Sequence, residues 1–282
     1  MNDTFHPVAI GGLGGSGTRM FARLLQLNGY YLGGDLNEAI DNLWFTLLFK
    51  RRSALLMQTE DFNDLMDIFI SVMSGDGCTS IIGSAEKYMS AVQDRLFHDG
   101  DWLGHRLVSL ISAAQTRRNS CAWGWKEPNT HIFIEKFLAR NKNIKYIHVL
   151  RNPYYMVGSK NQNQLMNWGG MFFDMDIEIS ERNSLAFWVK THQRIIRLQK
   201  TYPHRIKIMW YEDLVDDPYH SVADFNEFIE LPVTSKLLDQ FCSEVDTNGG
   251  VIESKESIGS EFFHEDVYYS QKIWLDRTHR ML

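Results

Sequence analysis

The residues from Gly11 to Gly17 (GGLGGSG) are mostly glycine, and they separate an apolar run at Val8–Ile10 from a helix predicted to begin at Thr18. Successive backbone N–H groups and a helix N-terminus both favour negative charge, and glycine lets a bulky anion approach the backbone. Arg19 and Arg23 follow on the helix. The stretch therefore predicts a site that holds a phosphate or sulfate group.

The spacing of Gly12 and Gly17 matches the two glycines of the GxxxxGK[ST] loop of nucleoside triphosphatases. The next positions, however, are Thr18 and Arg19. The lysine for the β- and γ-phosphates and the hydroxyl for magnesium are therefore not in register, which argues against ATP hydrolysis or kinase chemistry. A glycine-rich turn without a ligand is the alternative interpretation of the stretch.

A second basic segment, VLRNPYYMVGSK, places Arg151 just after a predicted strand, a proline at the start of a helix, and Ser159 further on. An arginine fork and a hydroxyl can hold a second phosphate, although Arg151 could equally cap a helix or pair with an acid. In the third segment, WYEDLVDDP, Tyr211 follows another predicted strand. Glu212 and Asp213 are natural helix-start residues, so this segment also has a purely structural interpretation.

Strands alternate with helices along most of the chain, which predicts a parallel sheet with helices on both faces and a ligand at the carboxyl ends of the strands. We expect strands at Val8–Ile10, Cys121–Trp125, Ile144–Leu150 and Arg205–Trp210, and helices at His131–Arg140, from Tyr154, at Ser180–Thr201 and at Pro232–Cys242. Thr247–Ser260 is expected to be a polar loop.

Helical patterns also fill the stretch between the first strand–helix unit and the next strand. They occupy Asn37–Arg52, Asp61–Met73, Glu86–Phe97 and Leu103–Arg117. We therefore expect one domain over residues 1–282, with a helical insertion at approximately 37–117.

The composition excludes several classes of protein. A formal charge of -6 predicts no general affinity for nucleic acid or anionic membranes. The N-terminal segment lacks the basic region of a signal peptide, and no apolar run is long enough for a membrane span, so we expect a soluble cytoplasmic protein. Three distant cysteines (Cys78, Cys121, Cys242) favour neither a disulfide framework nor a zinc ribbon, and the histidines lack metal-ligand spacing, so no metal is expected.

The motifs GGSGTR, RNPYYMVGS and YEDLVDDP, in that order, resemble those of the sulfotransferases that use 3′-phosphoadenosine 5′-phosphosulfate (PAPS), in their bacterial and tyrosylprotein-type branch. The resemblance implies a P-loop-type α/β fold. It implies that Arg151 and Ser159 hold the 3′-phosphate of the donor and that Tyr211 lies at the same edge of the sheet. It also implies that the first loop holds the 5′-phosphosulfate through Gly14, Gly15, Ser16, Gly17, Thr18 and Arg19.

The sequence departs from this family at one position, because many members have a lysine or arginine where Gly15 stands. The segment WGWKEPN resembles the family's K-x-P motif, which implies that Lys126 stabilises charge on the bridging oxygen, with Arg19 as a possible helper. A solvated charge at a strand end is the alternative for Lys126. The resemblance also implies a proton acceptor in the loop after the first helix, where Asp35 and Glu38 are the candidates; each could instead cap the Asn37–Arg52 helix.

We therefore predict in-line transfer of a sulfonate group from PAPS to a hydroxyl of a carbohydrate, lipid or small-molecule acceptor, without a metal. Trp44, Phe45 and Phe49 are candidate acceptor contacts, although aromatic residues at helical spacing are more often core. The alternatives are a P-loop nucleotide kinase-like phosphotransferase and a non-catalytic nucleotide-binding protein. The motifs contain no information on the acceptor or the oligomeric state.

Overall fold

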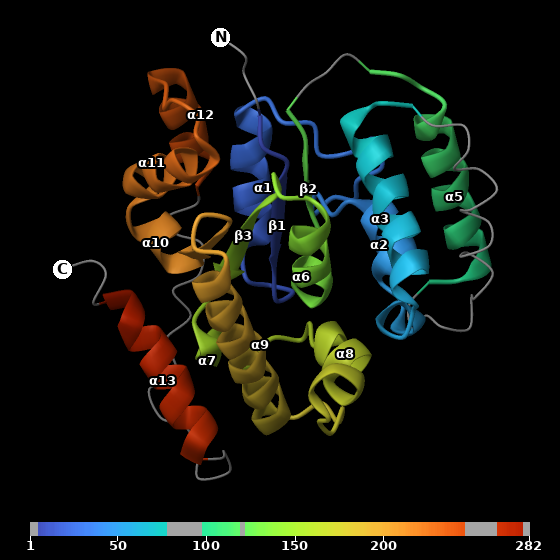
Figure 1. Ribbon diagram of the computed structural model, residues 1–282. Helices are drawn as coiled ribbons and strands as arrows, with labels where there is room; N and C mark the ends of the chain where they lie inside the picture. The colour runs from blue at the N-terminus through green and yellow to red at the C-terminus, as the bar shows by residue number, and fades with distance from the viewer. Residues whose placement is uncertain (1–4, 78–97, 119–121, 246–263, 279–282) are drawn as a thin grey trace. The chain divides into compact units, whose positions relative to one another are not determined.

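A computed structural model describes residues 5–77, 98–118, 122–245 and 264–278 of the chain (Figure 1). The strands are β1 (Val8–Gly12), β2 (Gly124–Lys126), β3 (Lys145–Leu150) and β4 (Ile206–Trp210). The helices are α1 (Thr18–Leu27), α2 (Leu43–Phe49), the 3₁₀ helix η1 (Arg52–Leu55), α3 (Thr59–Ser74), α5 (Gly100–Ala114), α6 (Thr130–Arg140), α7 (Pro153–Val157), α8 (Asn163–Phe173), α9 (Glu181–Thr201), α10 (Tyr211–Asp216), α11 (Pro218–Ile229), α12 (Ser235–Glu244) and α13 (His264–Thr278).

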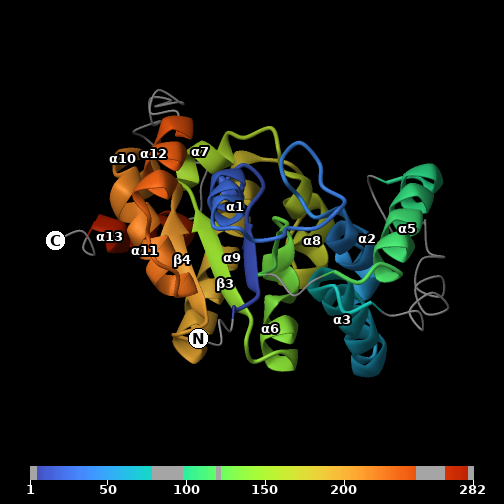
Figure 2. The ribbon, with the colours of Figure 1, turned by 90° about the horizontal axis from the view of Figure 1, so that it is seen from above.

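The four strands form one parallel sheet in the order β2-β1-β3-β4, flanked by helices, as the alternating pattern predicts. Strands β1 and β2 pair in parallel with Ile10 opposite Lys126. Figure 2 shows β3 and β4 side by side. Every residue of β1 and β3 is buried, which is why both appear in the sequence as unbroken apolar runs.

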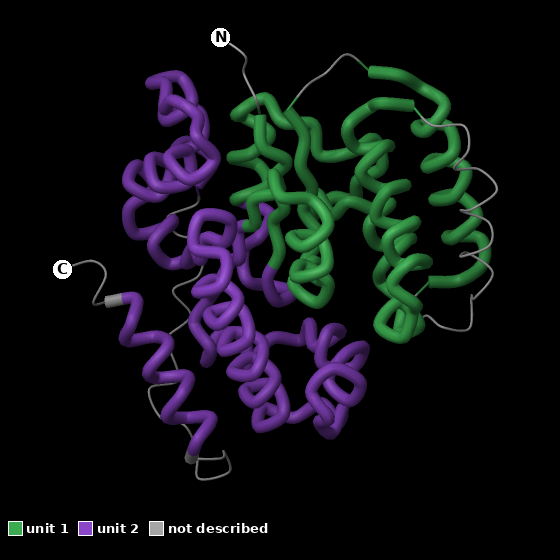
Figure 3. The backbone as a smooth tube through the Cα atoms, in the orientation of Figure 1, with its two compact units in different colours: residues 1–11, 21–146 green, residues 12–20, 147–282 purple. Residues whose placement is uncertain are grey.

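The chain divides into two compact units (Figure 3). Unit 1 contains residues 1–11 and 21–146, and unit 2 contains residues 12–20 and 147–282. The glycine loop thus belongs to unit 2 together with the segments that follow β3 and β4. The organisation as a single domain stays a prediction.

Unit 1 has an aromatic core in which helices α2, α3 and α5 contact one another. The ring of Phe45 lies 6.2 Å from that of Trp125 and 5.9 Å from that of Phe137, and Phe49 packs edge-on to Phe137 at 5.2 Å. Trp44, Phe45 and Phe49 are 1%, 0% and 0% exposed. These three candidate acceptor contacts are therefore core residues in this structure.

The predicted helix at Asn37–Arg52 is wrong at both ends, because α2 covers only Leu43–Phe49. The Asn37 side-chain oxygen accepts hydrogen bonds from the N–H groups of Ala39 and Asp41, which closes a turn in place of a helical start. Asn42 is the N-cap of α2, and its side chain accepts from the N–H of Phe45 at 2.8 Å. Neither Asp35 nor Glu38 has the capping role that the sequence left open.

Unit 2 is organised around α9, which contacts α7, α8, α13 and β4. Ser180 caps the start of α9 by accepting from the N–H of Asn183. Helix α13 is further fixed by Arg277, which pairs with Asp213 at 2.5 Å and with Asp216 at 2.8 Å at the ends of α10. Helix α8 is an element that the sequence patterns did not predict.

Some predictions fall on parts of the chain that the structure leaves undescribed. The helix at Glu86–Phe97, the polar loop at Thr247–Ser260, and Cys78 and Cys121 lie outside the described residues. Cys242 is a free cysteine. Among the described helices, none is both long and apolar enough to cross a membrane.

Candidate functional site: a glycine-loop anion site and a buried lysine

The glycine loop of unit 2 has a backbone that only glycine adopts readily. Gly15 and Gly17 have φ angles of +94° and +90°, in the region that side chains with a Cβ avoid. A Cβ at Gly17 would also collide with the ring of Tyr211. The conformation therefore brings the loop backbone and Tyr211 into direct contact.

The polar groups of this loop fit an anion. The N–H groups of Gly15, Gly17 and Thr18 have no hydrogen-bond acceptor within the described ranges, and they are followed at once by the start of α1. The hydroxyl of Ser16 is buried and also has no partner there. Buried donors without a partner are rare in folded proteins, so this cradle has the chemistry that a phosphate or sulfonate group requires.

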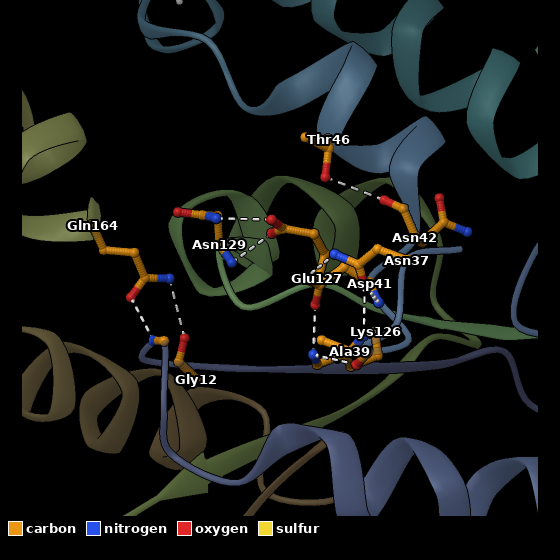
Figure 4. Close-up of polar contacts among 11 residues, drawn as sticks. Gly12, Asn37, Ala39, Asp41, Asn42, Thr46, Lys126, Glu127, Asn129 and Gln164 are labelled. Carbon is orange, nitrogen blue, oxygen red and sulfur yellow. Dashed lines mark hydrogen bonds and ion pairs between the residues drawn. The ribbon is translucent and has the colours of Figure 1, made fainter. Parts of the chain in front are cut away.

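Gln164, from α8, holds the loop in place. Its Nε2 donates to the carbonyl of Gly12, and its Oε1 accepts from the N–H of Gly14, both at 3.2 Å. Figure 4 shows the Gln164 side chain directed at Gly12. Sequence analysis missed this residue, because nothing in a glutamine on a helix far along the chain indicates such a contact.

Arg151 lies against the same loop. Its guanidinium donates to the carbonyl of Gly15 at 2.9 Å and lies 3.4 Å and 4.3 Å from the ring centroids of Tyr155 and Tyr211. The hydroxyl of Ser159 would be 3.7 Å from a Cβ built on Gly15. The structure thus brings together the residues expected at the second anion site, and it adds Tyr155, which sequence analysis did not single out.

The backbone behind Arg151 is held by three contacts. The side chain of Asn152 caps α7 by accepting from the N–H of Tyr154, and the N–H of Asn152 donates to Glu212 at 2.8 Å. Burial raises the pKa of the Glu212 carboxyl, opposed by these backbone hydrogen bonds and by Arg277 and Arg151. The indole N–H of Trp188 donates to the carbonyl of Arg151. Arg151 is therefore presented from a fixed main chain.

In unit 1, Lys126 is the last residue of β2 and is buried, with 3% of its side chain exposed. Its Nζ donates to the carbonyl of Ala39 at 2.9 Å and to Oδ1 of Asp41 at 2.5 Å (Figure 4). Lys126 is therefore not the solvated strand-end charge that the sequence left as an alternative.

The two candidate proton acceptors are placed differently. Asp35 pairs with Arg106 at 2.5 Å through Oδ1, and its Oδ2 is buried without a partner among the described residues. Glu38 is exposed, in the turn that precedes α2. The carboxylate on Lys126 is that of Asp41, which sequence analysis did not consider although it stands in the same acidic segment.

Glu127, next to Lys126, fixes the turn after β2. Its carboxylate accepts from the N–H of Asn129 at 2.5 Å and from the Asn129 side chain at 2.8 Å (Figure 4). Burial raises the pKa of this carboxyl, and the charge of Lys50 opposes the rise. The K-E-P-N segment is therefore a rigid turn at the end of the strand.

A parallel sheet whose first strand runs through a glycine loop into a helix, with unpartnered donors in the loop and an arginine against it, defines an anion-binding α/β protein of the P-loop type. Residues 7–235 match the sulfotransferase family. The chain belongs to this family, and its class of enzyme is a sulfotransferase.

Solved structures agree in fold. The sulfotransferase domain from the curacin biosynthetic pathway has a TM-score of 0.53 and 15% identity, over 95% of this chain and 97% of that one. The sulfotransferase domain of the Synechococcus PCC 7002 olefin synthase has a TM-score of 0.49 and 15% identity, over 96% of each chain. Retinol dehydratase in complex with androsterone and the inactive cofactor PAP has a TM-score of 0.41 and 12% identity, over 96% and 80%. No curated protein sequence matches the chain.

Proposed function

We propose that this sulfotransferase takes its sulfonate from PAPS, passes it to a hydroxyl of an acceptor and releases adenosine 3′,5′-bisphosphate. The observation that carries the proposal is the contact of Arg151 with the carbonyl of Gly15, between the rings of Tyr155 and Tyr211. A cation beside an anion cradle suits a ligand with two separate anionic groups. It suits a nucleoside triphosphate less well, because that ligand also needs the lysine and the magnesium hydroxyl that the loop lacks.

In this proposal the loop from Gly14 to Arg19 binds the 5′-phosphosulfate through its backbone N–H groups, with the buried hydroxyl of Ser16 as a further donor. Arg151 and Ser159 bind the 3′-phosphate, and Tyr211 lines the nucleotide site. PAPS is a substrate, and it supplies an activated sulfur atom. The chain's own groups bind it, orient it and screen the charge that develops on its bridging oxygen.

We assign that screening to Lys126, with Arg19 as a helper, because a buried ammonium acts strongly on nearby charge. The bond from the acceptor oxygen to sulfur forms as the bond from sulfur to the bridging oxygen breaks. The acceptor's proton leaves to a carboxylate of the 35–41 segment. Asp35 and Glu38 are the residues proposed for this step; Asp35 is oriented by its ion pair with Arg106.

Calorimetric titration tests the donor assignment, with adenosine 3′,5′-bisphosphate as one ligand and ATP with and without magnesium as the other. We expect tight, metal-independent binding of the bisphosphate and much weaker binding of ATP. Arg151→Ala should weaken bisphosphate binding roughly tenfold to a hundredfold, since hydrogen bonds to charged groups contribute about 1.5–3 kcal/mol.

The matched control is Arg140→Ala, which removes an arginine that pairs with Asp67 on the exposed surface of unit 1. It should bind the bisphosphate like the unmodified protein. Magnesium-dependent ATP binding with no response to the bisphosphate would favour a kinase-like phosphotransferase. Bisphosphate binding without any transfer activity would favour a nucleotide-binding protein.

A further inference from the structure

Lys126 is held by a single short turn of unit 1. Both of its contacts come from residues 39–41, one from the carbonyl of Ala39 and one from the carboxylate of Asp41. The carbonyl of Lys126 also accepts from the N–H of Asn42 at 2.7 Å, so that the turn grips the residue through both its main chain and its side chain.

This turn has a strained backbone. Ile40, between the two residues that contact Lys126, has a φ of +63°. A β-branched residue rarely adopts this conformation, at a cost of about 1–3 kcal/mol. Such strain persists where the surroundings fix it, and it gathers at functional sites.

Asn37 closes the turn from inside. Its Oδ1 accepts from the N–H groups of Ala39 and Asp41, and its Nδ2 donates to Oδ2 of Asp41 at 2.9 Å. The Asp41 carboxylate is thus fixed at both oxygens, by Asn37 on one and by Lys126 on the other. Its orientation toward Lys126 is determined in advance rather than chosen from several rotamers.

The ammonium of Lys126 has three N–H donors. The contacts with Ala39 and Asp41 use two of them. A buried ammonium also needs a counter-ion to remain charged, and Asp41 is that counter-ion. The arrangement leaves one donor, on a charged and immobile group, for an oxygen of a ligand.

We propose that Asp41 is the positioning residue for Lys126, and that the Asn37–Asp41 turn is built to keep this ammonium charged with one donor available. The proposal rests on the proposed function, in which Lys126 screens the bridging oxygen of PAPS. Asp41 acts through Lys126 and is not assigned a contact with either substrate.

Other charged groups also lie around this pair. Glu127 belongs to the turn that follows β2, and its buried carboxyl interacts with the charges of Lys50 and Asp41. Asp35 and Arg106 form their own ion pair in the same unit. Glu127 has its two oxygens on Asn129, so the carboxylate in contact with the ammonium is that of Asp41.

The first test needs no nucleotide. Acetic anhydride labels neutral, accessible amines, and mass spectrometry reads the labelling rate of each lysine peptide. Asp41→Ala should raise the rate at Lys126 roughly tenfold or more, because an unpaired buried ammonium gives up its proton more readily. Asp41→Asn keeps a hydrogen-bond acceptor but no charge, and it should give an intermediate rate. Asp67→Asn removes an exposed carboxylate from an ion pair in the same unit and should leave Lys126 unchanged.

An unchanged labelling rate at Lys126 in both Asp41 variants would overturn the proposal. A rise that extends to Lys50 and Lys145 would also overturn it, because it would show a general loosening of the unit. Neither result depends on the identity of the donor, so the proposed function stands or fails separately.

The second test joins the pair to turnover. Release of adenosine 3′,5′-bisphosphate from PAPS is followed with water and with 4-nitrophenol as stand-ins for the acceptor. Asp41→Asn should lower kcat roughly tenfold to a hundredfold with little change in the KM for PAPS. In a Lys126→Ala background the same change should have no further effect. An equal loss in both backgrounds would mean that Asp41 acts independently of Lys126.

Discussion

Gln164 shows at the scale of one residue how the shape of the anion loop is maintained. An amide side chain has both a donor and an acceptor, and Gln164 uses one on Gly12 and the other on Gly14. No other common side chain of this length supplies both. The N–H groups of the following residues are thereby left free to face a ligand.

Gln164→Glu should weaken binding of adenosine 3′,5′-bisphosphate roughly tenfold. The carboxylate still accepts from Gly14, but its second oxygen then faces the carbonyl of Gly12 without a proton between them, at a cost of about 1–3 kcal/mol. Calorimetric titration measures the effect. Gln199→Glu is the control, because Gln199 donates to the carbonyl of Ile206 in the same unit and far from the loop in sequence. Equal affinities for the unmodified and the Gln164→Glu proteins would show that the loop keeps its shape without this contact.

The candidate site was predictable where its residues follow strands in the sequence. The glycine loop, Arg151, Ser159 and Tyr211 all stand in local motifs, and local backbone chemistry suffices to suggest an anion. Gln164, Tyr155 and Asp41 have no such motif, because their contacts arise only when segments distant in sequence fold together. The same reason explains why the acid in contact with Lys126 was not among the two that the sequence suggested.

At the scale of elements, Asn42 determines where α2 begins. Its Oδ1 accepts from the N–H of Phe45, its Nδ2 donates to the carbonyl of Leu32 at 2.8 Å, and its main-chain N–H donates to Lys126. The residue is completely buried. It therefore joins the start of α2 both to the segment after α1 and to the end of β2.

Asn42→Ala should lower the free energy of unfolding by roughly 2–3 kcal/mol, because it removes a helix cap and leaves the buried carbonyl of Leu32 without its donor. Urea denaturation followed by circular dichroism measures the change. Asp99→Ala removes the exposed N-cap of α5, and it should cost only about 1 kcal/mol. If the two substitutions cost the same, the internal contacts of Asn42 contribute little.

The four strands and most of the helices were predictable within a few residues, because buried strands give short apolar runs and amphipathic helices a clear period. The start of α2 was not. An acidic segment before an apolar run is typical of a helix N-terminus, but the Asn37 side chain satisfies the N–H groups of Ala39 and Asp41 in a turn instead. Helix α8 contains Gly169 and Gly170, which favour a loop in the sequence. Its packing against α9 compensates for their low helix propensity.

At the scale of the whole molecule, each unit contains a carboxyl group with a raised pKa. Burial raises the pKa of Glu127 in unit 1 and of Glu212 in unit 2. A carboxyl whose pKa is higher in the folded state than in the unfolded state stabilises the fold fully below its unfolded value. That stability is lost as the pH rises through the folded value. Both groups therefore make the protein less stable as the pH rises above the ordinary glutamate value of 4.5.

Glu212→Gln tests this dependence in unit 2. The amide oxygen can still accept from the N–H of Asn152, as Oε1 of Glu212 does, but the side chain no longer ionises. The free energy of unfolding of the variant, relative to that of the unmodified protein, should therefore become more favourable as the pH rises from about 4 to about 8. Urea denaturation at several pH values measures the difference. Glu227→Gln, on exposed α11 sequence in the same unit, should show no such trend. A difference between Glu212→Gln and the unmodified protein that is constant across this range would mean that Glu212 ionises as readily in the folded chain as in the unfolded one. The attractions of Arg151 and Arg277 would then fully offset the cost of burying its charge.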